Sequence, residues 1–245
     1  MAQDMGCASS APLTDEELAP HRTGPDEELA TRPWRTLNVV CLHGLTMNAD
    51  LMRGWEAMRS LEKRCDGIAT FHYISAPHKF EANDWSRTNS IPVHDGSRAW
   101  FTTPPEYGWG ASQACVAEFA ASQVRGPIDV LIGYSQGGLM VANILQYLSE
   151  TEPYRSVRGA VLIHAPDFIN NAPNHKLCPS LKTVHVIGAR DKLVQPSSSA
   201  QLAQRFIQTE TATHDGEHYI FTPFPAEVLD RIYRMLVSLK PVSTV

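Results

Sequence analysis

The run Gly133-Tyr134-Ser135-Gln136-Gly137 constrains the fold of this chain more than any other feature. Glycines on both sides of a serine are typical of a sharp turn that has no room for neighbouring Cβ atoms. The mostly apolar run 128–132 before it indicates a strand buried on both faces, and the mostly apolar run 139–148 after it indicates a buried helix. We therefore predict a strand, a strained turn that presents Ser135, and a helix.

This order of elements is typical of an α/β-hydrolase, a doubly wound, mostly parallel sheet with helices on both faces. A chain of 245 residues can bury one sizeable core, so we expect a single domain over residues 36–242. Residues 1–35 hold seven acidic and three basic residues, four prolines and little apolar periodicity. We predict that they form an acidic, disordered tail before the domain.

A serine hydroxyl becomes a nucleophile only with a base within hydrogen-bond reach and an acid that orients the base. In this fold the acid and then the histidine follow the serine along the chain. Asp191 and Asp167 both follow an apolar run, at the carboxyl end of a predicted strand, where ligands bind open α/β sheets. We favour Asp191 as the acid, with Asp167 as the alternative. His218 is the predicted base, and His214 is its alternative.

Acyl transfer also needs hydrogen-bond donors for the oxyanion that forms on the carbonyl. The backbone N–H of Gln136, directly after the serine, is the first predicted donor. The second is the N–H of Leu45, in the loop that follows the predicted strand 37–42. Gly44 lets the backbone approach closely, and His43 is a candidate both for bracing this loop and for contacting a substrate.

Residues 76–110 are longer than an ordinary connection and are therefore a candidate lid or binding loop. The aromatic side chains of this segment would form an apolar wall for an acyl chain, although some of them could pack into the core instead. The substrate-binding candidates in this segment are Trp85, Trp100, Phe101, Tyr107 and Trp109.

Several other segments have a recognisable pattern: Cys41-Leu42-His43-Gly44, Arg98-Ala99-Trp100-Phe101, Tyr107-Gly108, Gly126-Pro127, Gly188-Ala189-Arg190-Asp191 and His214-Asp215-Gly216-Glu217-His218. Together with the serine motif they resemble the FSH serine hydrolases over about residues 36–240. Members of that family are small α/β-hydrolases that cleave esters or thioesters. The resemblance implies Ser135, Asp191 and His218 as a catalytic triad. The family often has two glycines before the final histidine, where this chain has Gly216 and Glu217.

The composition and charge of the chain argue against a metal, a transmembrane helix and a nucleic-acid partner. The five cysteines show no CxxC motif and no metal-ligand spacing, so we expect no metal and the reduced thiols of a cytoplasmic protein. No apolar run approaches the ~20 residues of a transmembrane helix. The net charge is −5 and lies mostly in the tail, so the body lacks the basic excess of a nucleic-acid-binding protein.

We therefore expect a serine hydrolase that needs no cofactor and cleaves a small-molecule ester or thioester through an acyl-enzyme, favouring apolar acyl chains. One alternative is a thioesterase acting on acyl carriers or acyl-CoA, and another is a ligand-binding module with little turnover. A third is a scaffold that recruits partners through the acidic tail. Residues 5–10 would also fit an N-myristoylation signal if translation began at Met5. The sequence predicts no oligomeric state.

Overall fold

The structure, a computed structural model, describes residues 35–81, 93–102, 108–146, 153–167, 177–220 and 222–240. Trp85, Tyr107 and the expected tail up to residue 34 lie outside these ranges. The described elements, in chain order, are β1 (Leu37–Leu42), α2 (Ala49–Gly54), α3 (Glu56–Arg64), β2 (Ala69–Ile74), β3 (His78–Lys79), β4 (Arg98–Ala99), α4 (Trp109–Gln123), β5 (Val130–Tyr134), α5 (Gln136–Gln146), η1 (Tyr154–Ser156), β6 (Gly159–Ile163), β7 (Leu177–Gly188), α6 (Pro196–Gln204), β8 (Phe206–His214) and α7 (Ala226–Ser238).

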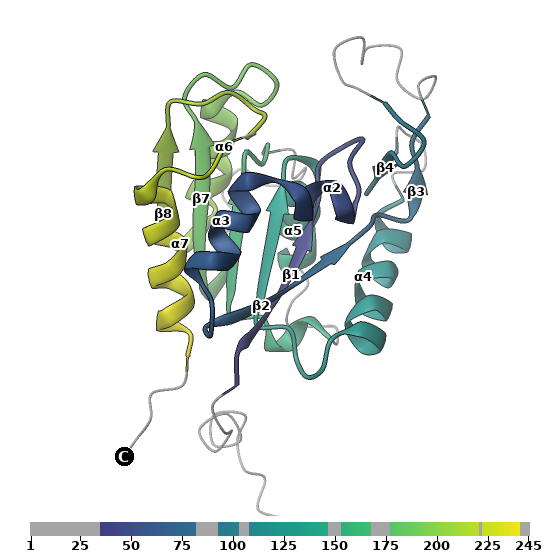
Figure 1. Cartoon of the computed structure of the whole chain (residues 1–245), viewed down its shortest axis with the longest axis horizontal. Helices are drawn as coiled ribbons and strands as arrows, with labels where there is room; N and C mark the ends of the chain where they lie inside the picture. The colour runs from purple at the N-terminus through teal and green to yellow at the C-terminus, as the bar shows by residue number, and fades with distance from the viewer. Residues whose placement is uncertain are drawn as a thin grey trace, which may run out of the picture. The chain divides into compact units, whose positions relative to one another are not determined.

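In the described part of the chain, six of the strands form one parallel sheet in the order β2-β1-β5-β6-β7-β8 (Figure 1). Every residue of β1, β5 and β6 is buried, as their nearly continuous apolar sequences require of strands covered on both faces. Contacts group Thr36–Val242 into one unit. This architecture is the α/β-hydrolase arrangement expected from the serine motif.

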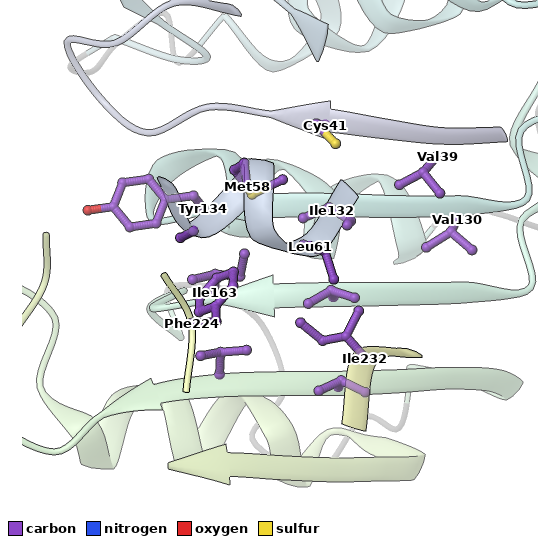
Figure 2. Packing of buried hydrophobic residues seen from close by; sticks show 14 of the residues in the cluster. Val39, Cys41, Met58, Leu61, Val130, Ile132, Tyr134, Ile163, Phe224 and Ile232 are labelled. Atoms are coloured by element: carbon purple, nitrogen blue, oxygen red, sulfur yellow. The ribbon is translucent and has the colours of Figure 1, made fainter. Parts of the chain in front are cut away.

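Helices cover both faces of the sheet. On one face, alternate strand residues such as Cys41, Ile132 and Ile163 pack against α3 and α7, including Leu61 and Ile232 (Figure 2). On the other face, the intervening residues pack against α4, α5 and α6. The alternation of side chains along each strand therefore builds two hydrophobic cores from one set of strands.

Several element boundaries differ from the sequence-based expectation, and the strand expected over residues 128–132 is β5, which spans Val130–Tyr134. Helix α5 begins at Gln136 rather than near residue 139, because the turn consists of Ser135 alone and the following glycines belong to the helix. The run 183–188 before Asp191 indicates a strand in the sequence, but β7 already begins at Leu177, and its pairing with β8 shifts register between Leu177 and Lys182. Such an irregularity interrupts the periodicity by which a strand is recognised.

The strand order places the site. The chain leaves β1 toward β2 on one side and later returns to β5 on the other side, so the order reverses between β1 and β5. Loops after the carboxyl ends of these two strands diverge at that point and leave a crevice for ligands. Leu42 of β1 is paired with Gly133 of β5, so the loop after β1 lies beside the Ser135 turn.

Candidate active site

Ser135 is the single residue between β5 and α5, and its φ is 52°. This left-handed conformation is strained for a residue with a side chain and persists only where the surrounding structure enforces it. The N–H of Ser135 donates to the carbonyl of Ile163 at 2.8 Å, and its carbonyl accepts from the N–H of Leu139 at 3.1 Å. The turn thus holds a partly exposed serine at the carboxyl end of the sheet.

Gly137 shows why the motif needs glycine. A Cβ at this position would lie 2.2 Å from the carbonyl oxygen of Leu42 and 2.4 Å from that of His43. Both are backbone atoms, which cannot rotate away as a flexible side chain can. Helix α5 therefore packs against the end of β1 at a distance that only glycine permits.

Ser135, His218 and Asp191, which lie far apart in the sequence, form one chain of hydrogen bonds. The Oγ of Ser135 lies 2.9 Å from Nε2 of His218, and Nδ1 of His218 lies 2.7 Å from Oδ2 of Asp191. The three residues come from the turns and loops that follow β5, β8 and β7. This arrangement can move a proton from the serine hydroxyl to the imidazole while the carboxylate stabilises the imidazolium.

Asp191 is held as a carboxylate. Its Oδ1 accepts hydrogen bonds from the backbone N–H groups of Leu193 at 2.9 Å and Val194 at 2.8 Å, which leaves Oδ2 for His218. Burial alone would raise the pKa of Asp191, but the hydrogen bonds from His218 and Val194 hold that pKa below its usual range. A negative charge therefore faces the imidazole.

The two alternative residues lie elsewhere. Asp167 forms an ion pair with Arg205, with 2.9 Å between Oδ1 and Nε, and its backbone N–H donates a hydrogen bond to Oγ of Ser198 at 2.9 Å. His214 directs its Nε2 at Nε2 of His164, 2.8 Å away. Neither alternative is hydrogen-bonded to Ser135 or His218 in the described part of the chain. The geometry therefore favours the pair Asp191 and His218.

The comparisons with known proteins identify a family. The family model described as serine hydrolase (FSH1) matches residues 33–231. The chain belongs to this family. It is 28% identical over 206 residues to "Esterase CG5412" of Drosophila melanogaster, covering 78% of this chain and 69% of that protein. It is also 28% identical over 201 residues to "Esterase OVCA2" of Xenopus tropicalis, covering 76% of this chain and 86% of that protein.

Solved structures agree on the fold of this serine hydrolase. The structure of esterase PE8 matches with a TM-score of 0.59 at 17% identity, covering 83% of this chain and 93% of that chain. The Bacillus cereus carboxylesterase matches with a TM-score of 0.57 at 15% identity, covering 84% and 90%. Both support the α/β-hydrolase architecture.

In this FSH1-family hydrolase, the buried side chain of His43 stabilises the loop after β1. His43 is completely buried, its Nε2 accepts from the N–H of Ala76 at 2.9 Å, and its Nδ1 lies 2.7 Å from the carbonyl of Gly44. Burial lowers the pKa of His43 to about 4, so the ring is neutral near pH 7. His43 therefore braces the loop, and its expected contact with substrate is wrong because no part of the ring is exposed.

Trp100 also corrects an expectation. It was a candidate for the substrate wall, but its side chain is completely buried. Its indole N–H donates to the carbonyl of His43 at 2.8 Å, and its backbone N–H donates to Oε1 of Gln136 at 2.8 Å. An indole whose N–H reaches a buried carbonyl is stable in the core. Trp100 thus stabilises the loop after β1 through the hydrogen bond to His43.

A cavity of about 260 Å³ opens beside Ser135 and His218. Most of its wall is apolar, and the lining residues besides the serine and histidine are Leu45, Phe101, Tyr134, Gln136, Leu139, Pro166, Leu193, Val194 and Tyr219. Of the aromatic substrate-binding candidates that the structure describes, Phe101 is therefore the one that lines the cavity. Trp109 stacks on its ring, with 4.3 Å between the ring centroids. Trp85 and Tyr107 lie outside the described residues.

Sequence reasoning missed several residues of this site. Pro166 and Leu193 follow the strands β6 and β7, so their position after strand ends was an available signal. His164, directly after β6, was missed because it belongs to none of the motifs considered. It lies with Asp191 and His218 in the one described group of His, Cys, Asp and Glu side chains whose ligand atoms fall within 4.8 Å of one another. These atoms already pair with each other, so we assign the group to the hydrogen-bonded site and not to a metal.

Proposed function

We propose that this serine hydrolase cleaves carboxylic esters through an acyl-enzyme, with Ser135 as nucleophile, His218 as general base and Asp191 as the acid that orients it. The observation that carries the proposal is the hydrogen-bonded chain of the three side chains, at 2.9 and 2.7 Å, beside an apolar cavity. The family and the esterase-named relatives support ester hydrolysis.

In the proposed mechanism, His218 takes the hydroxyl proton of Ser135 as Oγ attacks the ester carbonyl carbon. The tetrahedral intermediate then collapses, the bond to the leaving alkoxide breaks, and His218 gives its proton to that oxygen. Water, deprotonated by His218, attacks the acyl-serine in the same way and releases the acid. Asp191 remains ionised throughout and stabilises the imidazolium.

The oxyanion would be held by the backbone N–H groups of Leu45 and Gln136. Both residues line the cavity with Ser135. Gln136 is the first residue of α5, and the N–H groups of a first helical turn have no partner within the helix. No hydrogen bond to the N–H of Leu45 is present among the described residues. Preorganised donors of this kind account for much of the rate enhancement in acyl transfer.

The apolar lining supports a preference for apolar acyl chains. Leu139, Pro166 and Val194 offer no charge to a substrate, and the described lining residues include neither lysine nor arginine. A neutral acyl group would therefore gain free energy by leaving water, whereas this described lining offers no cationic side chain to the phosphates of acyl-CoA. These features support simple esters over acyl-CoA thioesters.

The free cysteines among the described residues, Cys41, Cys65 and Cys115, fit a cytoplasmic protein. None of the described helices has the length and apolarity to cross a bilayer.

Covalent labelling tests the proposed nucleophile. A fluorophosphonate probe should label the folded protein at Ser135, because His218 activates that hydroxyl and the N–H groups of Leu45 and Gln136 accommodate the phosphoryl oxygen. Mass spectrometry of the digested protein would locate the adduct, and heat-denatured protein is the control for non-specific labelling. A folded protein that gives no adduct would favour the ligand-binding module without turnover.

A series of p-nitrophenyl esters tests the acyl preference. Burying one methylene contributes about 0.8 kcal/mol, so kcat/KM should rise about fourfold per methylene from acetate until the cavity is full. Replacing Leu139 by tryptophan should stop the rise at a shorter chain by filling the cavity. A flat series would contradict the preference, and faster cleavage of acyl-CoA than of the matched ester would assign a thioesterase instead.

A further inference from the structure

His164 is a completely buried histidine beside the triad that the mechanism above does not use. It follows β6 directly, and its φ is 48°, a conformation that costs free energy for any residue with a side chain. Its packing is tight, since a Cβ at Gly188 would lie 3.0 Å from Cε1 of the His164 ring. A strained and buried polar side chain persists only where its surroundings determine its position.

The hydrogen bonds of His164 assign its tautomer. The N–H of Gly216 donates to Nδ1 of His214 at 3.0 Å, so a neutral His214 carries its proton on Nε2. That Nε2 donates to Nε2 of His164 at 2.8 Å. The remaining nitrogen of His164, Nδ1, must then carry a proton. It donates to the backbone carbonyl of His218 at 2.8 Å, and Oδ2 of Asp191 lies 3.4 Å from it.

The carbonyl of His218 therefore receives two buried donors. The hydroxyl of Tyr134 donates to it at 2.9 Å, and Nδ1 of His164 donates at 2.8 Å. A carbonyl oxygen has two lone pairs, so both are used. This fixes the backbone of the very residue whose ring must span the distance between Asp191 and Ser135.

His164 also has to be neutral. The titratable groups that face it are Tyr134 from β5, His214 from β8, and Asp191 and His218 from the loops after β7 and β8. Burial, and next the charge that His218 acquires on protonation, lower the pKa of His164 to about 3. Burial also lowers the pKa of His214. A neutral His164 does not repel the His218 imidazolium, whose ring centroid lies 5.6 Å away.

We propose that His164 is a positioning residue for the general base: it is oriented by His214 and, through Nδ1–H, holds the His218 backbone so that the imidazole meets both Asp191 and Ser135. The inference rests on the proposed function of the triad. It adds to that function a line of hydrogen bonds that runs from Gly216 through two histidines to the base.

Two substitutions at His164 distinguish the role of Nδ1 from that of Nε2. The amide nitrogen of asparagine falls near the position of Nδ1, whereas the amide of glutamine reaches only the position of Nε2. His164→Gln should therefore lower kcat for p-nitrophenyl butyrate by about 10- to 100-fold, the range found when a metal-ligating histidine loses its outer hydrogen-bond partner, with KM unchanged. His164→Asn should keep a kcat much closer to that of the wild type than His164→Gln does. Asparagine also tolerates a positive φ.

A matched control is His185→Gln. His185 is buried in β7, and its described contact is the ring of Phe206, so its replacement should leave kcat unchanged. Circular dichroism and thermal unfolding would confirm that each variant is folded. Equal kcat in both His164 variants, whether near the wild-type value or equally reduced, would overturn the proposal, because Nδ1 would then have no special part.

The tautomers themselves can be measured in the wild-type enzyme if a variant fails to fold. Nitrogen NMR of isotope-labelled histidines should show the proton of His164 on Nδ1 and that of His214 on Nε2. The opposite tautomer at His164 would overturn the proposal. This measurement requires no turnover, so it distinguishes the two claims: a wild type that is neither active nor labelled at Ser135 contradicts the proposed function, whatever the tautomers are.

Discussion

Replacing Asp191 by asparagine should lower kcat by about 10⁴-fold, the loss expected when the base is held in the wrong tautomer. Two backbone N–H groups, those of Leu193 and Val194, bind Oδ1 of Asp191 and would keep the oxygen of asparagine in that place. The amide NH₂ would then face His218 and could only donate to its Nδ1. The proton of His218 would move to Nε2, which could no longer accept the proton of Ser135.

Asp167→Asn is the control for this experiment, since Asp167 was the alternative acid. Its carboxylate pairs with Arg205 at 2.9 Å, so the substitution should weaken that ion pair and lower thermal stability while leaving kcat near the wild-type value. Steady-state kinetics on both folded variants would decide the assignment. Loss of activity in Asp167→Asn together with retained activity in Asp191→Asn would show that the acid is wrongly assigned.

Gly137→Ala should destabilise the protein by at least about 3 kcal/mol, at the upper end of the usual cost of overpacking. The new Cβ would lie 2.2 and 2.4 Å from two carbonyl oxygens at the end of β1, and relief requires α5 and β1 to separate. Because a domain of this kind has only about 5–15 kcal/mol of stability, this loss would remove a large share of the free energy of unfolding. Urea unfolding, followed by fluorescence, measures the change.

Gly110→Ala is the matched control for that substitution. Gly110 lies in the first turn of α4, and nothing stands within 4 Å of a Cβ placed there. Alanine has the higher helix propensity, so this variant should be unchanged or more stable by up to about 1 kcal/mol. If the two variants unfold at the same urea concentration, the close packing of α5 on β1 is not what requires glycine at position 137.

The parts of the site that could be predicted are those with a local signature. Ser135 was found through its glycines and the apolar runs around it, and Asp191 and His218 were found through strand ends and chain order. The structure places these three side chains together, while their catalytic parts remain proposals. The architecture was predictable for the same reason, because buried parallel strands have continuous apolar sequences that can be recognised one at a time.

The missed features depend on contacts between distant segments. Trp100 is aromatic in a long connection, which favours a binding wall, but its burial is decided by the carbonyl of His43 and the side chain of Gln136. His164 acquires its surroundings from residues 50 and 54 positions later in the chain, His214 and His218. No local pattern indicates a positive φ or a pairing at that range.

The position of β8 at the edge of the sheet has a consequence for biosynthesis. His218 follows that last strand and lies 83 residues beyond Ser135. A ribosome therefore completes the serine turn and the loop after β1 long before it delivers the proposed base. A nascent chain, or any product truncated before β8, would lack the base that we propose for Ser135. With His218 as the proposed base, hydrolysis by this protein requires that synthesis has passed β8 and that β8 has paired with β7.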